Sequence, residues 1–230
     1  MWISLFLLIF ITFILFQKKL RQKIALKRWR LALELDKHAP VFQKLYADID
    51  GFALSRQARK EQDAIEYLYG EIIFEPFIAL LSLCNPNSST VFYDLGSGTG
   101  KAVLACAMVF DINKSYGIEL FPSLNKTALS QQQRLSKIAG YQSKADSIRF
   151  INNDFLKIDL VEASLIFINS TAFFGESWDA VSRHLEQIKS GALVISTSKS
   201  LHSRCFITVR KTEVAMSWGY VTAIIQRRID

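Results

Sequence analysis

The residues with the clearest chemical potential form a short glycine-rich loop. The stretch D-L-G-S-G-T-G at residues 94–100 follows an apolar run and precedes an apolar, helix-like segment that starts at Lys101. Because glycine has no Cβ, the backbone of such a loop can approach a ligand closely, and the following helix offers free N–H groups. Its spacing is G-x-G-x-G, whereas loops that hold a dinucleotide pyrophosphate read G-x-G-x-x-G. The Asp94 carboxylate favours a positively charged ligand end, such as the amino group and sulfonium of S-adenosylmethionine.

Two further acidic positions follow the loop in the right order for an adenosine ligand. An apolar strand pattern over residues 115–118 ends at Glu119, 25 residues after Asp94. An acid at that point accepts hydrogen bonds from ribose hydroxyls. A third strand pattern runs into Asp154 and Phe155, whose carboxylate and ring could contact the edge and the face of adenine. The ordered set predicts an adenosine-ligand site.

The loop also resembles a known family motif. Y-D-L-G-S-G-T-G at residues 93–100 is similar to the first motif of class I S-adenosylmethionine-dependent methyltransferases, and the similarity extends from Tyr69 to the C-terminus. Within that superfamily the chain most resembles the non-SET protein-lysine methyltransferases of the disruptor-of-telomeric-silencing type. The resemblance implies S-adenosylmethionine as the cofactor and a protein lysine as the methyl acceptor.

Three local matches carry this resemblance: Y-G-E at residues 69–71, F-I-N-S-T-A-F at 167–173, and S-T-S-K at 196–199 with M-S-W at 216–218. They imply that Asn169 is catalytic and lies beside the transferred methyl. The family commonly has two Asn in a row, but Ser170 stands at the second position, so substrate specificity does not transfer. The full set of predicted cofactor-binding residues is Tyr69, Glu71, Asp94, Gly96, Ser97, Gly98, Gly100, Glu119, Asp154 and Phe155. No metal site is predicted, because the three cysteines have no metal-ligand spacing.

The alternation of strand and helix patterns predicts an α/β fold of Rossmann-like, class I methyltransferase type. We expect a seven-stranded, mostly parallel sheet whose last two strands, near residues 205–209 and 221–227, form an antiparallel edge hairpin. Upstream, Pro40 is expected to interrupt a helical region, residues 50–51 to form a turn, and a helix to run from Ser55 to Tyr69. The next helix is expected to begin at Pro76. These helices are expected to cover the cofactor site.

The N-terminal segment predicts a membrane anchor. Residues 2–16 form an uncharged 15-residue run, about 22 Å long as a helix. A cleaved signal peptide is the rival, but no basic residue precedes the run and no small-residue cleavage site follows it. The predicted organisation is a transmembrane anchor at 1–17, a basic juxtamembrane and helical region at 18–68, and a methyltransferase domain at 69–230.

Charge predicts the orientation of that anchor. Seven basic residues and no acid lie between Gln17 and Arg30, which favours a cytoplasmic flank and catalytic domain with the N-terminus outside. Subtracting these seven from the 28 Lys+Arg leaves 21, equal to the 21 Asp+Glu, so the net charge of +7 belongs to this segment. The rest of the chain has no basic excess, which disfavours a nucleic-acid partner.

The predicted function is therefore membrane-anchored methylation of a protein lysine by direct in-line transfer. Methylation of a lipid or a small apolar acceptor is one alternative. A membrane-tethered module that binds the cofactor without turnover is another. A nicotinamide-dependent oxidoreductase is disfavoured by the loop spacing.

Overall fold

The computed structural model describes residues 2–60 and 62–230, and for residues 2–13 it describes the backbone alone. Within this part of the chain, seven strands form one sheet in the order β3-β2-β1-β4-β5-β7-β6. The strands are β1 (Val91–Leu95), β2 (Lys114–Glu119), β3 (Ile148–Asn152), β4 (Leu165–Ile168), β5 (Leu193–Thr197), β6 (Phe206–Met216) and β7 (Gly219–Arg228). The first five pair in parallel, and β7 joins β5 and β6 in antiparallel pairs. The predicted Rossmann-like sheet is confirmed.

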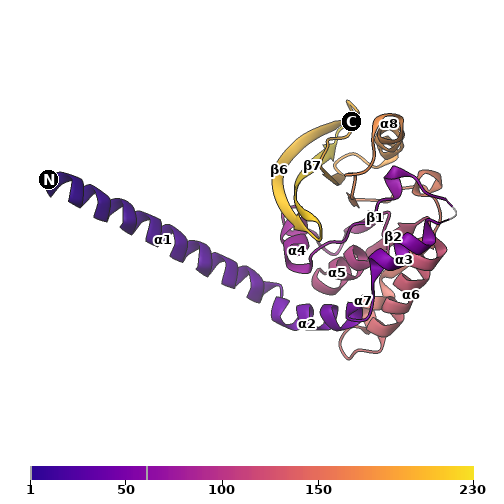
Figure 1. Cartoon of the computed structure of the whole chain (residues 1–230), viewed down its shortest axis with the longest axis horizontal. Helices are drawn as coiled ribbons and strands as arrows, with labels where there is room; N and C mark the ends of the chain where they lie inside the picture. The colour runs from indigo at the N-terminus through magenta and orange to yellow at the C-terminus, as the bar shows by residue number, and fades with distance from the viewer. Residues whose placement is uncertain (1, 61) are drawn as a thin grey trace.

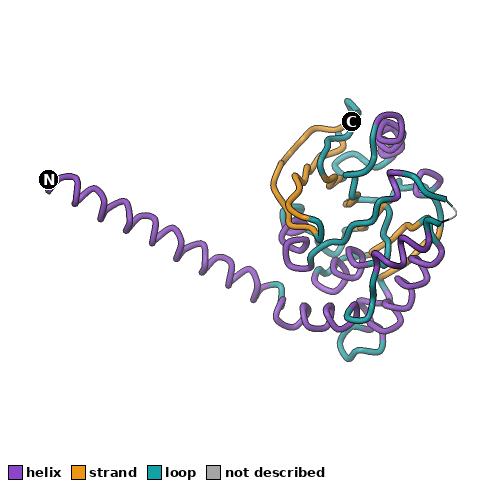
Figure 2. Tube along the Cα trace, viewed as in Figure 1, coloured by secondary structure: helices purple, strands orange, loops and turns teal. Residues whose placement is uncertain are grey.

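Helices and loops surround this sheet (Figure 2). The helices are α1 (Trp2–Ala32), α2 (Leu35–Tyr46), α3 (Gly51–Ala58), α4 (Phe74–Ser82), α5 (Lys101–Val109), α6 (Pro122–Ser136), α7 (Gln142–Asp146) and α8 (Gly175–His184), with short 3-10 turns η1 (Ile65–Tyr67), η2 (Phe155–Lys157) and η3 (Leu185–Gln187). All five residues of β1 are buried, as expected for a strand covered on both faces.

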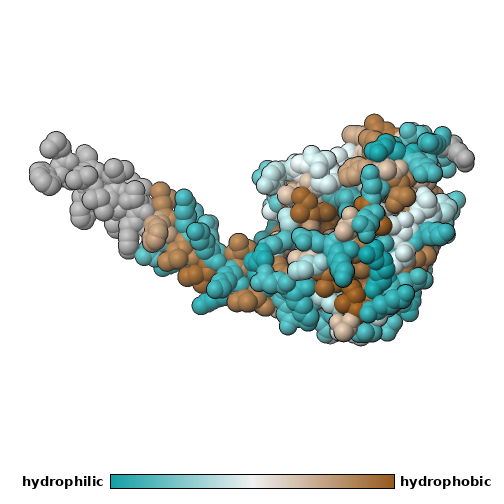
Figure 3. Space-filling model, turned by 60° about the horizontal axis from the view of Figure 1, so that its bottom comes forward, coloured by the Kyte–Doolittle hydropathy of each residue, from teal (hydrophilic) through white to brown (hydrophobic). Residues whose placement is uncertain are grey.

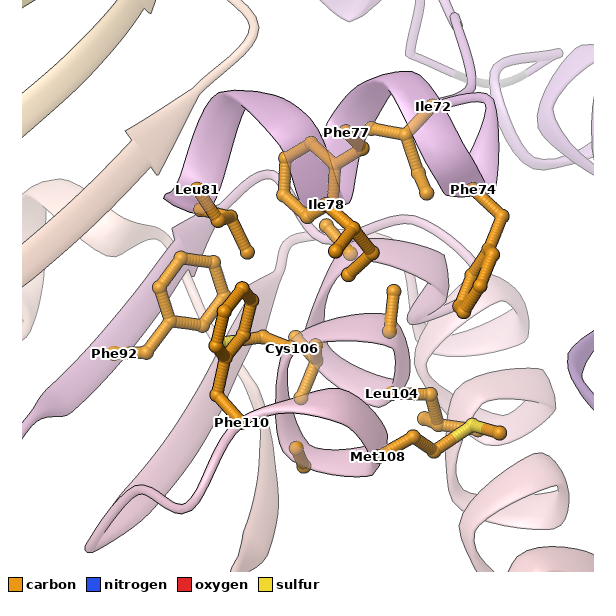
Figure 4. Close-up of a cluster of buried hydrophobic side chains, with 14 of the residues drawn as sticks. Ile72, Phe74, Phe77, Ile78, Leu81, Phe92, Leu104, Cys106, Met108 and Phe110 are labelled. Atoms are coloured by element: carbon orange, nitrogen blue, oxygen red, sulfur yellow. The ribbon is translucent and has the colours of Figure 1, made fainter. Parts of the chain in front are cut away.

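Alternate residues of the central strands enter two separate hydrophobic clusters. Phe92 of β1 packs with α2, α4 and α5, whereas its neighbours Val91 and Tyr93 pack with α8. This alternation follows from the two-residue period of a strand, which sends successive side chains to opposite faces. Figure 4 shows the first cluster, in which side chains of α4, among them Phe77 and Ile78, face those of α5 and Phe92. The two clusters hold the strand ends, and so the loops that follow them, in fixed positions.

The region before the sheet differs from the sequence prediction. Pro40 lies inside α2, and the chain breaks earlier, at Glu34, which adopts a left-handed conformation with φ 48°. Asp50 does not form a turn with Gly51 but caps α3, its carboxylate accepting from the Ala53 N–H at 2.9 Å. The predicted helix from Ser55 to Tyr69 is wrong: α3 stops at Ala58, and only η1 follows in the described part of that segment.

Helix α4 begins at Phe74, two residues before the expected start at Pro76, because Pro is accepted within the first helical turn, where N–H groups have no intrahelical partner. The edge hairpin is also longer than predicted. Strand β6 continues to Met216 and β7 starts at Gly219, so the two strands are joined by Ser217 and Trp218 alone.

Helix α1 runs out from the body of the molecule (Figure 1). Its last turn is attached to α4: the Trp29 indole N–H donates to Ser82 Oγ at 3.1 Å, and the Arg30 guanidinium pairs with Glu75. Arg30 also bonds Asp36 at 2.6 Å, at the start of α2. The surface of the described part of α1 mixes apolar and basic side chains (Figure 3).

The prediction of a single-pass membrane protein is wrong. Across the described residues, no helix has both the length and the apolar character that crossing a membrane requires. The apolar run of 15 residues is shorter than the ~20 that a spanning helix needs, and α1 continues through the basic segment. Most of the predicted anchor at 1–17 falls on residues whose side chains lie outside the described part. The predicted orientation, with the N-terminus outside and the catalytic domain cytoplasmic, depended on that membrane-spanning helix and is wrong as well.

The division of the chain at residues 17 and 68 stays a prediction. The structure adds that α2 is part of the main core, because Leu35, Phe42, Leu45 and Tyr46 belong to the cluster that packs on α5 and β1.

Candidate functional site: a cleft at the carboxyl ends of the parallel strands

The glycine loop lies where β1 ends and α5 begins. It is therefore at the carboxyl ends of the parallel strands, where α/β proteins bind ligands. Gly96 and Gly98 have φ values of +81° and +55°, a region that favours glycine. A Cβ on Gly98 would lie 2.7 Å from the Tyr69 ring, so only glycine lets that ring cover the loop. A Cβ on Gly96 would meet no protein atom within 4 Å. Gly96 therefore borders open space that a ligand can fill.

Two adjoining cavities lie at these carboxyl ends. The larger, about 360 Å³, lies within the usual range for small-molecule sites. Its wall includes Tyr67, Tyr69, Gly96, Glu119, Phe121, Leu124, Asp154, Phe155, Asn169 and Phe173. The smaller, about 30 Å³, is lined among others by Tyr69, Gly70, Glu71, Asp94, Gly96, Ser97, Gly98, Thr99, Lys101, Asn169 and Met216. Tyr69, Gly70, Gly96 and Asn169 line both, so the two cavities form one elongated site.

The structure brings nearly all the predicted site residues to these walls. Glu119, Asp154 and Phe155 line the larger cavity, while Glu71, Asp94, Ser97 and Gly98 line the smaller one. Gly100 is the exception. It lines neither cavity, and a Cβ there would lie 2.6 Å from the Phe150 ring and 2.9 Å from Ala128. Its role in the structure is to let α5 pack closely against α6 and β3.

Two buried carboxylates define the electrostatics of the site. Asp94 is only 4% exposed, and burial, reinforced by the nearby Glu119 carboxylate, raises its pKa to about 8. Burial also raises the pKa of Glu119, opposed by N–H donors from Phe121 at 2.9 Å and from Gly98 at 2.7 Å. Through the Gly98 bond, the end of β2 holds the glycine loop. A cationic group that paired with the Asp94 carboxylate near pH 7 would therefore replace a proton.

A polar network spans the smaller cavity. The Tyr69 hydroxyl donates to Glu71 Oε1 at 2.9 Å and lies 3.1 Å from Thr99 Oγ1. On the other side, Lys101 Nζ donates to Glu71 Oε2 at 2.5 Å, and both side chains are largely buried. Burial raises the pKa of Tyr69, which keeps its hydroxyl protonated as a donor. The site therefore presents an ammonium and a carboxylate side by side, complementary to an amino-acid zwitterion.

Sequence reasoning missed Lys101, although its position directly after the glycine loop was a usable signal. It also missed Tyr67 and Phe121, which meet edge to face with ring centroids 5.3 Å apart on the wall of the larger cavity. Phe121 follows Glu119 by two residues, so the strand-end acid pointed to it. Tyr67 had no comparable signal, because it lies in η1, within the segment predicted as one long helix.

Asn169 lies where β4 ends and is held by the neighbouring strand end. The Ser170 N–H donates to Thr197 Oγ1 at 3.0 Å, so the Thr197 hydroxyl is free to donate to Asn169 Oδ1, at 2.8 Å. This chain of bonds sets the orientation of the Asn169 amide. Ser170 is fully buried and donates to the Thr197 carbonyl at 2.5 Å. The Ser at this position therefore ties β4 to β5 and faces away from the site.

The segment after Asn169 is attached to the loop after β5 by Lys199. Its ammonium donates to the carbonyl oxygens of Phe173 and Thr171 and lies 3.9 Å from the centre of the Phe174 ring. Partial burial lowers the pKa of Lys199. These contacts fix Phe173 at the wall of the larger cavity.

A Rossmann-like sheet with an acid-headed glycine loop and a strand-end acid defines the class of S-adenosylmethionine-dependent methyltransferases. Within that class, the profile described as "Histone methylation protein DOT1" matches residues 54–225. The chain belongs to the DOT1 family. This match bears out the predicted enzyme class, a methyltransferase, and its predicted cofactor, S-adenosylmethionine.

Curated relatives and solved structures agree with this assignment. The chain is 31% identical over 137 residues to "Histone-lysine N-methyltransferase, H3 lysine-79 specific" of Candida glabrata, covering 56% of this chain and 21% of the relative. The relative of the same name from Caenorhabditis elegans is 30% identical over 163 residues, covering 68% of this chain and 17% of the relative. The chain thus spans about a fifth of the length of these relatives. In fold it is similar to an RNA methyltransferase from Salinibacter ruber solved with S-adenosyl-L-homocysteine, with a TM-score of 0.55, 22% identity, and coverage of 67% of this chain and 90% of that one.

Proposed function

We propose that this chain transfers a methyl group from S-adenosylmethionine to the side-chain amine of a protein lysine. The observation that supports this most directly is the position of Asn169, in the wall shared by both cavities and oriented by Thr197. A group at that junction would lie beside a ligand that extends from one cavity into the other. The lysine acceptor is supported by the curated relatives, which are named histone-lysine methyltransferases.

The residues present fit the cofactor. The adenosine part would occupy the larger cavity, with Glu119 accepting from the ribose hydroxyls and Asp154 with Phe155 contacting the adenine. The methionine end would reach the smaller cavity, where Asp94 and Glu71 would accept from its ammonium. Lys101 would bind its carboxylate. The open space beside Gly96 gives the cofactor backbone a path between the two.

Bound S-adenosylmethionine supplies a methyl group already activated by the sulfonium charge. The chain then has to orient the acceptor nitrogen in line and exclude water. Asn169 would orient the acceptor through its side-chain amide, whose Oδ1 accepts from the Thr197 hydroxyl at 2.8 Å and from the Thr171 N–H at 3.5 Å. The acceptor lysine must arrive neutral, and its ordinary pKa of ~10.4 is lowered by an apolar surrounding that disfavours the ammonium. No side chain is required as an obligatory base.

One feature favours a second candidate, a small apolar acceptor. Leu68 and Leu156 line the larger cavity and are 56% and 38% exposed, so the rim of the cleft is apolar. Such a rim would also suit the aliphatic stem of lysine. The two acceptors are separated by where the methyl group is recovered.

The test uses the full chain with tritiated S-adenosylmethionine and, in parallel, histone octamers, a total protein lysate, and an organic extract of the same cells. We expect label in methyl-lysine after acid hydrolysis of the protein. Asn169→Ala should slow transfer by about 100-fold, because it misorients the acceptor, and leave the cofactor Kd within about threefold. Asn113→Ala, an exposed Asn before β2 at the opposite edge of the sheet, is the matched control. Label confined to the organic extract would favour the second candidate, and no transfer to any fraction would contradict both.

A further inference from the structure

The tip of the β6–β7 hairpin touches the loop that carries Tyr69 and Glu71. The Glu71 N–H donates to Ser217 Oγ at 3.0 Å, and the Ser217 N–H donates back to the Glu71 carbonyl at 2.9 Å. One residue further along each segment, Ile72 and Met216 form an antiparallel bridge. These contacts join parts of the chain that lie 146 residues apart.

A further contact joins the aromatic ring of Trp218 to Gly70. The Trp218 indole lies directly over Gly70, so a Cβ on Gly70 would overlap the ring atom Cζ3. Gly70 lines both cavities. The ring therefore closes the outer side of the loop whose inner side forms the cavity wall.

The loop depends on this support. Residues 68–73 lie between η1 and α4 and have no helix of their own to satisfy their backbone groups. The hairpin tip supplies both hydrogen bonds of the Glu71 backbone named above. On the cavity side, the same residue carries the carboxylate that binds Tyr69 and Lys101. A shift of the tip would move that carboxylate.

The adenosine half of the site is held differently. Glu119 is fixed by N–H groups of Gly98 and Phe121, and Asp154 accepts from the Leu156 N–H at 2.9 Å, all within the parallel part of the fold. Met216, next to the hairpin tip, is a lining residue of the smaller cavity and not of the larger one.

From these contacts we infer that Ser217 and Trp218 are positioning residues for cofactor binding: they set the affinity for the amino-acid end of the cofactor and leave the affinity for its adenosine end unchanged. The inference rests on the proposed function. It assigns to the M-S-W segment at 216–218, which was not among the predicted cofactor-binding residues, a part in cofactor binding.

Two ligands separate this role from a general loss of stability. S-adenosylmethionine has the amino-acid end, and 5′-methylthioadenosine shares the adenosine part but lacks it. Each is titrated calorimetrically into the full chain and into the variants Ser217→Ala and Trp218→Ala. Ser217→Thr keeps the hydroxyl and is the conservative variant. Tyr220→Ala is the matched control, because Tyr220 follows the same tip but is 80% exposed.

We expect Trp218→Ala to weaken S-adenosylmethionine at least tenfold, and Ser217→Ala three- to tenfold. Binding of methylthioadenosine should stay within twofold, and Ser217→Thr and Tyr220→Ala should match the wild type. Trp218 is 39% exposed, so its removal also exposes apolar surface and should lower the thermal midpoint. The ratio of the two affinities is unaffected by such a general loss of stability. Equal losses for both ligands, or no loss for either, would overturn the inference. Failure of the proposed function would appear in the wild type itself, as an absence of S-adenosylmethionine binding, and would overturn both.

Discussion

The raised pKa of Asp94 makes cofactor binding depend on pH. At pH 7 a carboxyl with a pKa of about 8 is about 90% protonated, so a cationic ligand end must displace the proton before it can pair with the carboxylate. The apparent Kd is then multiplied by 1 + 10^(8 − pH): about 100 at pH 6, about 11 at pH 7 and about 2 at pH 8. Lowering the pH from 7 to 6, where the ligand amino group stays charged, should therefore weaken S-adenosylmethionine about ninefold.

The pH range over which the change in affinity can be assigned to Asp94 is limited by the ligand's amino group and by the neighbouring Glu119. The α-amino group of the ligand has an ordinary pKa of ~7.7–8.0, so it is charged below pH 7, and the slope there belongs to the protein. The other charged residues of the two cavities are Glu71 and Lys101 in the smaller one, and Glu66, Glu119, Asp154 and Lys157 in the larger one. Glu119 also has a raised pKa, so the assignment to Asp94 needs a variant.

The assay is calorimetric titration with S-adenosylmethionine at pH 6, 7 and 8 in two buffers of different ionisation enthalpy, which counts released protons. The wild type should release about one proton per ligand at pH 6. Asp94→Asn should bind with nearly constant affinity between pH 6 and 7. Its affinity should approach that of the wild type at pH 6, where the wild-type carboxyl is protonated. Asp111→Asn, at an exposed position two residues after the end of α5, should keep the wild-type slope. A flat profile in the wild type, or the same slope in Asp94→Asn, would refute the reasoning.

Two further predictions follow from the same cavity. Asp94→Asn should raise the thermal midpoint of the ligand-free protein at pH 8: the folded pKa is above the unfolded value, so ionisation from about pH 4 to 8 destabilises the fold, by up to about 5 kcal/mol. An unchanged midpoint between pH 5 and 8 in the wild type would contradict this. Lys101→Met should weaken S-adenosylmethionine about tenfold and decarboxylated S-adenosylmethionine by less than twofold, because only the first has the carboxylate that Lys101 would bind. Equal losses would remove Lys101 from that role.

The parallel part of the fold was predictable because its signals are local. Each strand is a short apolar run, and the residues that follow it, Asp94, Glu119, Asp154 and Asn169, come to one edge by the rule that parallel strands end together. The glycine loop and these strand ends therefore predict most of the residues that line the two cavities.

The missing parts depend on contacts that no local pattern records. Lys101 meets Glu71 across 30 residues, and Ser217 meets Glu71 across 146. Residues 207–211 of β6 are all exposed, and the sequence K-T-E-V-A-M at 211–216 has no alternation of polar and apolar residues, so the strand was predicted to end too early. The break at Glu34 was also invisible, since a non-glycine residue with positive φ has no strong sequence signal.

Because α1 is attached through its last turn, a small change of angle there displaces the far end of the helix by a large distance. From Ile14 to Ala32 it is about 27 Å long, so a tilt of about 10° at its base would move the Ile14 end by about 5 Å. Trp29 and Arg30, through Ser82, Glu75 and Asp36, set the angle at which the helix leaves the body. Small changes in these side chains would therefore cause large displacements of the N-terminal part of α1.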